Sequence, residues 1–189
     1  MYNPLYRIVA MALLVLVVAM TTATPLLADK GRSGSGGKGS NRHVVAAAVD
    51  PLYLKECGSC HMPYAPALLP ARSWQQMMAH LDKHFGENAE LPVADKNSIQ
   101  QYLMANSSEQ STAPLAKKIL VSIPAAEIPA SISTTPYFIR EHRKITLQQV
   151  RENPNIRSFA ACQACHTQAN AGSFDEHEVL VPTAAQGKP

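Results

Sequence analysis

Two short segments hold all four cysteines of the chain, and each segment ends in a histidine. The first is residues 57–61, Cys-Gly-Ser-Cys-His, and the second is residues 162–166, Cys-Gln-Ala-Cys-His. In a helical segment, positions i, i+3 and i+4 lie on one face, so each segment presents two thiols and an imidazole together. C-x-x-C-H is the attachment signature of c-type haem: the thiols bond to two vinyl groups and the histidine binds the iron. The sequence therefore predicts two covalent haems, held by Cys57, Cys60 and His61 and by Cys162, Cys165 and His166.

Three other uses of four cysteines have weaker support. Exported chains often form disulfides, and four cysteines allow three pairings. A thioredoxin-like C-x-x-C motif belongs to a βαβ context, and no strand pattern of that kind is visible here. A zinc site of four cysteines needs no histidine directly after each pair. Covalent haem uses both histidines and leaves no cysteine over. Aromatic residues make up only 6% of the chain and provide little bulk for a core, which two macrocycles would fill.

Each iron has a second axial position, and the remaining histidines are candidates for it: His43, His80, His84, His142 and His177. We predict His84 for the first haem, because it lies beside Met77 at the edge of a helical apolar face. From an edge, a ring can reach the iron while its other nitrogen finds a hydrogen bond. Met77 or Met104 is the alternative and would give a His/Met haem of higher potential. His80 is expected to face solvent.

For the second haem, His142 and His177 compete. His142 lies in a segment expected to be helical, so it can approach the iron from the side opposite His166. His177 follows His166 by eleven residues, a loop that can wrap round a haem edge but has little slack. We therefore favour His142 and keep His177 as the alternative. The carboxylates beside His177 predict an acidic patch that could steer a basic redox partner: Asp175, Glu176 and Glu178.

Short helices are expected to position these groups. Asp50-Pro51 and Thr135-Pro136 are helix-start signals, one ahead of the first motif and one ahead of His142. Ser73 with Gln76 predicts a capping box for a helix that reaches Phe85. Further helices are expected over about 93–104, after Thr146 and after Ser158, whereas residues 119–132 contain two prolines and are expected to be extended at best. The predicted class is mostly α, with short helices and long loops packed around the two haems.

The first 28 residues predict export. Arg7 precedes a run of thirteen apolar residues, Ile8–Met20, and the small residue Ala28 precedes Asp29, as in a secretory signal peptide. An uncleaved membrane anchor over the same residues is the alternative. Residues 29–43 are rich in Gly and Ser and predict a flexible tether. The polar stretch 106–112 suggests a boundary between two small haem domains, residues 44–112 and 113–189.

With these residues in place, the chain resembles the bacterial dihaem cytochrome c family of exported electron-transfer proteins. The resemblance runs from about residue 57 to 182. It rests on both C-x-x-C-H motifs and on four further stretches: LLPARSW (68–74), HFGENAEL (84–91), TPYF with REHR (135–143) and FDEHEV (174–179). It implies two cytochrome c-like domains with one haem each, and bis-histidine ligation at both irons. It also implies two partners, a small monohaem cytochrome c and a membrane cytochrome b.

The expected function is periplasmic electron relay by a protein that is not an enzyme. If protein ligands fill both axial positions of each iron, no open position is left for a substrate. A haem enzyme or gas sensor with one exchangeable iron ligand is the alternative. The 17 Lys and Arg against 14 Asp and Glu give a net charge of +3, too weak to suggest a nucleic-acid binder. Membrane contact is expected only through the possible N-terminal anchor.

Overall fold

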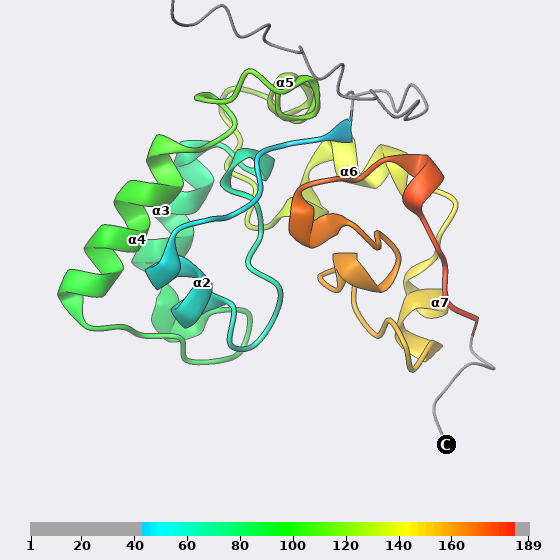
Figure 1. Ribbon diagram of the computed structural model, residues 1–189, viewed down its shortest axis with the longest axis horizontal. Coiled ribbons are helices and arrows are strands. Elements are labelled where there is room, and N and C mark those ends of the chain that lie inside the picture. Colours follow the sequence, from blue (N-terminus) through cyan, green and yellow to red (C-terminus); the bar gives the residue numbers. More distant parts are fainter. Residues whose placement is uncertain (1–42, 184–189) are drawn as a thin grey trace, which may run out of the picture. The chain divides into compact units, whose positions relative to one another are not determined.

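Short helices joined by long loops make up residues 43–183, the part of the chain that the computed structural model describes (Figure 1). Within these residues, extended pairing is limited to isolated bridges. The predicted mostly α class is confirmed. The predicted signal peptide and nearly all of the tether lie outside the described residues. The α-helices are α2 (Pro51–Cys57), α3 (Ala71–Ala79), α4 (Val93–Ala105), α5 (Pro114–Ser122), α6 (Pro136–Glu141) and α7 (Leu147–Glu152). The 3₁₀ turns are η2 (Pro66–Leu68), η3 (Leu81–Lys83), η4 (Ile132–Thr134), η5 (Cys162–Ala164), η6 (Ala169–Ala171) and η7 (Glu176–Glu178).

The predicted helix starts at Asp50, Thr135 and Thr146 are confirmed. An Asp50 carboxylate oxygen accepts a hydrogen bond from the Tyr53 amide at 2.8 Å, which satisfies an amide that the first turn of α2 leaves free. The Thr135 hydroxyl accepts from the Phe138 amide in the same way at the start of α6. Thr146 and Gln149 form a reciprocal capping box at the start of α7. At these three positions the local sequence signal and the observed helix start agree.

Three sequence expectations about α3 and α5 were wrong. The Ser73 capping box does not form, because α3 already begins at Ala71 after Pro70, and the Ser73 hydroxyl is buried in the helix. That helix ends at Ala79, so Phe85 leaves the apolar face and is 65% exposed. Residues 114–122 form α5, although residues 119–132 were expected to be extended. Pro114 starts that helix, and Pro124 lies beyond its end, where a proline does no damage.

Helix α3 packs against α4, and α2 lies against α4 as well (Figure 1). Trp74 is 2% exposed, and its indole N–H donates to the Pro66 carbonyl at 2.8 Å, so the ring is both buried and satisfied. This cluster supports the segments on either side of the first motif. Its buried members are Tyr53, Leu69, Trp74, Met78, Leu81, Ile99 and Leu103.

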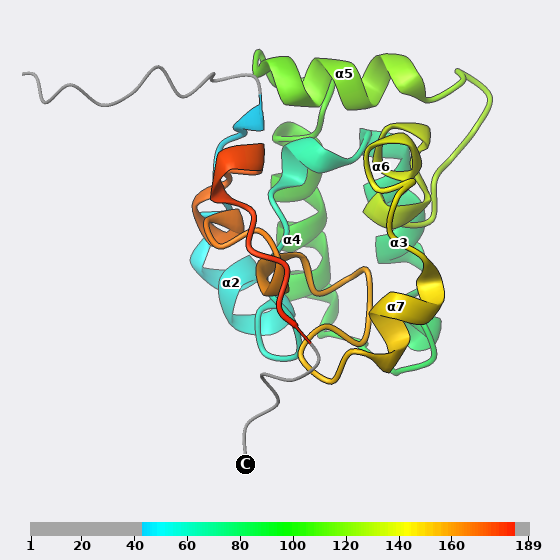
Figure 2. The same cartoon turned by 90° about the vertical axis from the view of Figure 1, so that its right-hand side faces the viewer.

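A second apolar cluster joins α5 to η2 and α6, and Figure 2 shows α5 across one end of α3 and α4. It takes residues from before and after position 112, so the two halves share a core here. The division into domains 44–112 and 113–189 stays a prediction. The cluster consists of Val45, Ala65, Ala67, Leu68, Leu115, Ala116, Ile119, Ile123 and Tyr137.

The first described residues pair with a segment near the C-terminus. The Val45 amide donates to the Gly172 carbonyl at 2.9 Å, and the Phe174 amide donates to the His43 carbonyl at 2.8 Å. Gly172 has φ +80°, a left-handed conformation that favours glycine. The chain is therefore tied together over more than a hundred residues of sequence. Among residues 43–183, no helix has the length and apolar character needed to cross a membrane.

Candidate haem sites

The first C-x-x-C-H motif meets His84. Helix α2 ends at Cys57, so the motif continues as a turn rather than as the predicted helix. His84 follows η3, and its ring lies 6.2 Å from that of His61, measured between centroids, with 23° between the ring planes. His80, which ends α3, is exposed as expected. The Met104 sulfur accepts a hydrogen bond from Gln100 on its own helix.

The second C-x-x-C-H motif meets His142. Cys162 begins η5, a short 3₁₀ turn, where a longer helix was expected. His142 ends α6, and the centroid of its ring lies 6.0 Å from that of His166, with 69° between the planes. His177, the alternative, has an exposed ring on η7, and its backbone amide bonds to the Asp175 carboxylate. The structure thus brings His142, and not His177, to the ring of His166.

Hydrogen bonds set the tautomer of two of these imidazoles. The His61 Nδ1 lies 2.7 Å from the Met62 carbonyl, and the His142 Nδ1 lies 2.9 Å from the Phe138 carbonyl. Because a carbonyl oxygen only accepts, Nδ1 is the donor in each contact, which leaves Nε2 as the nitrogen that could bind a metal. An imidazole in this state is a metal ligand whose orientation is fixed from behind.

Burial and a neighbouring histidine lower the pKa of the other two imidazoles. Burial, and then the nearby His61, lower the pKa of His84. Burial, and then the nearby His142, lower the pKa of His166. The Nδ1 of His166 is also buried without a hydrogen-bond partner among the described residues. For His84 and His166, these shifts favour the unprotonated ring that a metal ligand requires.

None of the four cysteines is paired in a disulfide, which argues against the disulfide alternative. Burial is the main cause that raises the pKa of Cys57 and of Cys162, each to about 11. Cys60 is exposed, and Cys165 is half-buried.

These donors fit two haems. A metal-bound imidazole nitrogen lies about 2 Å from the metal, so two rings across one ion have centroids about 6 Å apart. Both histidine pairs meet this spacing. In residues 138–183, the only buried hydrophobic residues are Val150 and Ala169, so protein side chains alone provide little core around the second motif. A macrocycle at each motif would supply apolar surface for that core.

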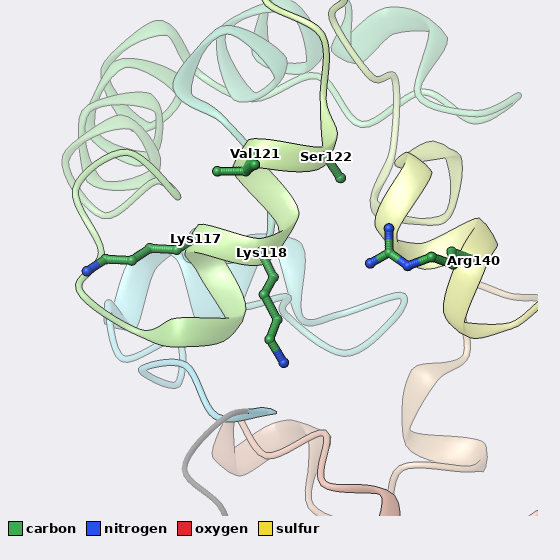
Figure 3. A pocket seen from close by; sticks show the side chains of 5 residues that line it. All are labelled: Lys117, Lys118, Val121, Ser122 and Arg140. Atoms are coloured by element: carbon green, nitrogen blue, oxygen red, sulfur yellow. The ribbon is translucent and has the colours of Figure 1, made fainter.

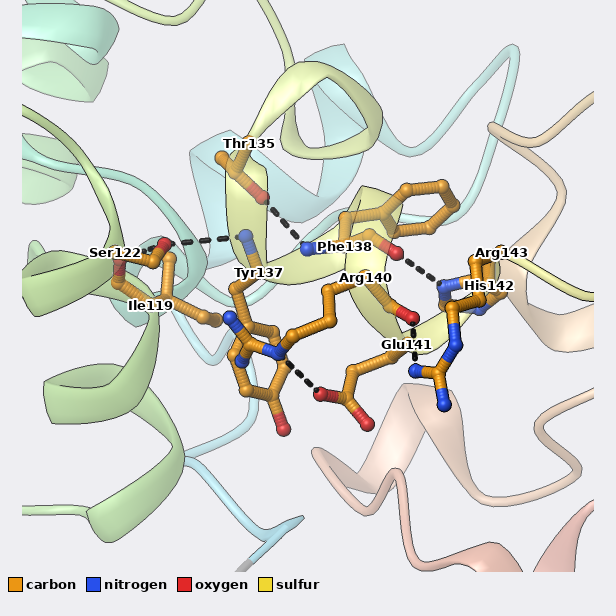
Figure 4. Close-up of polar contacts among 9 residues, drawn as sticks. All are labelled: Ile119, Ser122, Thr135, Tyr137, Phe138, Arg140, Glu141, His142 and Arg143. Atoms are coloured by element: carbon orange, nitrogen blue, oxygen red, sulfur yellow. Dashed lines mark hydrogen bonds and ion pairs between the residues drawn. The ribbon is translucent and has the colours of Figure 1, made fainter.

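Aromatic rings line both histidine pairs, and the sequence interpretation missed them. Phe138 stacks on His142 with centroids 3.9 Å apart (Figure 4), and Phe159 meets the same ring edge-on. Phe174 packs edge-on against His166 at 5.4 Å. Tyr64 stacks on His61 at 4.8 Å. Position relative to the motifs was the available signal, since Tyr64 and Phe159 each lie three residues from a motif.

Two charged features lie near the second site. Arg140 pairs with Glu141 and lies over the Tyr137 ring, and it lines an open hollow between α5 and α6 with Lys117 and Lys118 (Figures 3 and 4). This surface is basic. The predicted acidic patch around His177 is smaller than expected, because Asp175 is buried and caps η7. Its other members, Glu176 and Glu178, are exposed.

A helical chain with two C-x-x-C-H motifs, each facing a second histidine, defines a c-type cytochrome with two haem sites. The profile of the dihaem cytochrome c family matches residues 53–174. The chain belongs to this family, as the resemblance predicted. Two covalently bound c-type haems are characteristic of the family, and the four cysteines of this chain are compatible with them.

Solved structures agree with this assignment. A diheme cytochrome c from Rhodobacter sphaeroides is 42% identical, with a TM-score of 0.61, over 69% of this chain and 100% of that one. The diheme cytochrome c of Shewanella baltica is 36% identical, with a TM-score of 0.57, over 70% of this chain and 92% of that one. A search of curated proteins gave no match.

Proposed function

We propose that this protein is an exported electron carrier that relays electrons through two bis-histidine haems and catalyses no reaction itself. The observation that carries the proposal is the pairing of each motif histidine with a second histidine at about 6 Å. Haem supplies a one-electron couple whose potential its axial ligands tune. With both axial positions filled by protein, the chain offers no open iron for a substrate.

Each residue then has a defined role. Cys57 and Cys60 attach the first haem, and Cys162 and Cys165 attach the second. His61 and His166 are the proximal ligands. His84 and His142 are the distal ligands, with His177 as the alternative that the geometry favours less. Two imidazole ligands give a lower potential than a His/Met pair does, so we expect low potentials at both irons.

We further propose that the protein works in the periplasm between a membrane cytochrome b-type donor and a small soluble monohaem cytochrome c. The predicted signal peptide and the need to attach c-type haem outside the cytoplasm support this location. The resemblance to the dihaem cytochrome c family supports haem proteins as the redox partners. Neither nucleic acid nor a small-molecule substrate is expected as a partner.

The decisive experiment is the spectrum of the reduced holoprotein with and without carbon monoxide, combined with a redox titration. We expect two low-potential transitions and no spectral change with carbon monoxide. A shift on adding the gas would reveal an exchangeable ligand and would favour the haem enzyme or gas sensor. A charge-transfer band typical of methionine ligation in the oxidised spectrum would overturn the distal assignment.

A further inference from the structure

One side chain joins the first motif to the segment that leads into the second. Tyr64 lies in the loop directly after the first motif, and its ring stacks on the His61 imidazole at 4.8 Å with 25° between the planes. Its hydroxyl donates to the Ala160 carbonyl at 2.7 Å. Ala160 lies two residues before Cys162, in the segment that leads into the second motif. Tyr64 therefore stacks on the histidine of the first motif and donates a hydrogen bond, across 96 positions of sequence, to the segment just before the second motif.

The position of Tyr64 is itself fixed from behind. Tyr53, which is 3% exposed in the core against α4, donates its hydroxyl to the Tyr64 carbonyl at 2.9 Å. The backbone of Tyr64 is thus tied to helix α2, which ends at Cys57. On the other side, Ala160 and Ala161 are tied to Ser158 by their amides, so the accepting carbonyl lies in a tight turn. Because both segments are anchored, a hydrogen bond between them fixes their separation better than a bond between two mobile loops would.

We propose that Tyr64 is a positioning residue that holds the two haem-attachment segments at a fixed separation and thereby sets the rate of electron transfer between the haems. The inference rests on the proposed electron relay. Electron tunnelling falls steeply with distance, so a relay needs the two sites held close and rigid. Ring and hydroxyl have separate tasks: the ring packs on the ligand of the first haem, and the hydroxyl holds the segment of the second.

The chain offers a matched control. Tyr102 is also half-buried, and its hydroxyl accepts a hydrogen bond from the Val49 amide at 3.0 Å. This bond lies wholly within residues 44–112 and does not reach the second motif. Tyr102→Phe therefore removes one tyrosine hydroxyl from the same part of the fold without touching the proposed connection.

The test compares wild type, Tyr64→Phe and Tyr102→Phe as dihaem holoproteins, using flash photoreduction to measure electron exchange between the haems. Loss of one net hydrogen bond should raise the population of conformations in which the two segments separate by roughly fivefold. Because tunnelling is slower in those conformations, we expect Tyr64→Phe to exchange electrons more slowly than wild type. Both midpoint potentials and both low-spin spectra should stay unchanged, because the ring still packs on His61. Amide hydrogen exchange in residues 158–162 should become faster. Tyr102→Phe should change none of these.

A third variant separates the two tasks. Tyr64→Leu also removes the ring, so we expect it to shift the potential or the spectrum of the first haem. The potential and the spectrum of the second haem should stay unchanged. If Tyr64→Phe exchanges electrons at the wild-type rate, or slows no more than Tyr102→Phe, the proposal is wrong. If wild type itself shows no exchange between the haems, the relay function fails instead, and the two outcomes are distinguishable.

Discussion

The two proposed distal histidines are held by different means. His142 ends a capped helix, and its Nδ1 bonds to the Phe138 carbonyl one turn back, under a stacked phenyl ring. His84 lies on a turn, directly before Phe85, which has φ +53°. A left-handed residue beside a ligand marks a local backbone constraint that the surrounding fold must maintain. The position of the His84 ring therefore depends mainly on the conformation of its loop, and the position of the His142 ring depends mainly on helix α6.

We predict that His84→Ala opens the first iron. Removal of the second imidazole leaves that iron five-coordinate, so one of the two haems should become high-spin and bind carbon monoxide. Optical spectra of the reduced protein with and without the gas provide the measurement. His80→Ala is the control and should leave the spectrum unchanged, because His80 is exposed at the end of α3. The opposite result would exchange the roles of the two histidines.

For the second haem, His142→Ala should give the same high-spin signature, and His177→Ala should not. The rings of His142 and His166 lie 6.0 Å apart, whereas the ring of His177 is exposed. Low-temperature EPR of the two oxidised variants separates the outcomes, since only the opened iron loses its low-spin signal. Loss of that signal in His177→Ala alone would reverse the assignment.

At the scale of elements, one helix cap supports a proposed ligand. Thr135 is 1% exposed, and its hydroxyl accepts from the Phe138 amide (Figure 4) and donates to the Ile132 carbonyl. It thus starts the short helix whose other end is His142. A helix of six residues has little stability of its own, so its cap matters to the histidine that it carries.

We predict that Thr135→Ala lowers the free energy of unfolding by about 1 kcal/mol and raises the fraction of second haem that binds carbon monoxide. Denaturant unfolding and carbon monoxide titration of the holoprotein measure the two effects. Thr135→Ser keeps the hydroxyl and should restore both. Thr146→Ala removes the cap of α7, which carries no predicted ligand, so it should cost similar stability and leave the second haem as it is. Equal carbon monoxide binding in the two alanine variants would contradict the role of α6.

At the scale of the whole molecule, the contact of residues 43–45 with 172–174 joins the two ends of the described chain. Gly172 combines φ +80° with close approach to the backbone of Val45 and Ala47, so a Cβ there would overlap the Val45 carbonyl oxygen. The long-range tie therefore depends on the absence of a side chain at one position. Haem attachment alone would not provide this contact.

We predict that Gly172→Ala destabilises the holoprotein more than Gly86→Ala does. Both positions have positive φ, which costs a residue with a side chain about 1–2 kcal/mol. Only Gly172 adds a steric overlap, because a Cβ on Gly86 would have no neighbouring atom within 4 Å. The midpoints of guanidinium unfolding give the comparison. Equal losses would show that residues 43–45 contribute little to stability.

The sequence by itself determined the chemistry and the local starts of structure. The cofactor follows from two C-x-x-C-H motifs, because the spacing of two thiols and an imidazole is a covalent requirement that holds in any fold. The caps at Asp50, Thr135 and Thr146 were also predictable, because their hydrogen bonds reach only three residues along the chain. His84 and His142 could be ranked, but only as the better of several candidates.

Only the tertiary structure decided what depends on packing between distant segments. Residues 114–122 became helical although β-branched residues and nearby prolines argued against it, because one face of α5 is buried against η2 and α6. Helix α3 begins at Ala71 rather than after Ser73, because in this arrangement the side chains of Ser73 and Trp74 are both buried in the core. The ring pairs at about 6 Å and the bond from Tyr64 to Ala160 join residues far apart in sequence. No local pattern records such distances, since they arise from the sum of all the packing contacts between the segments.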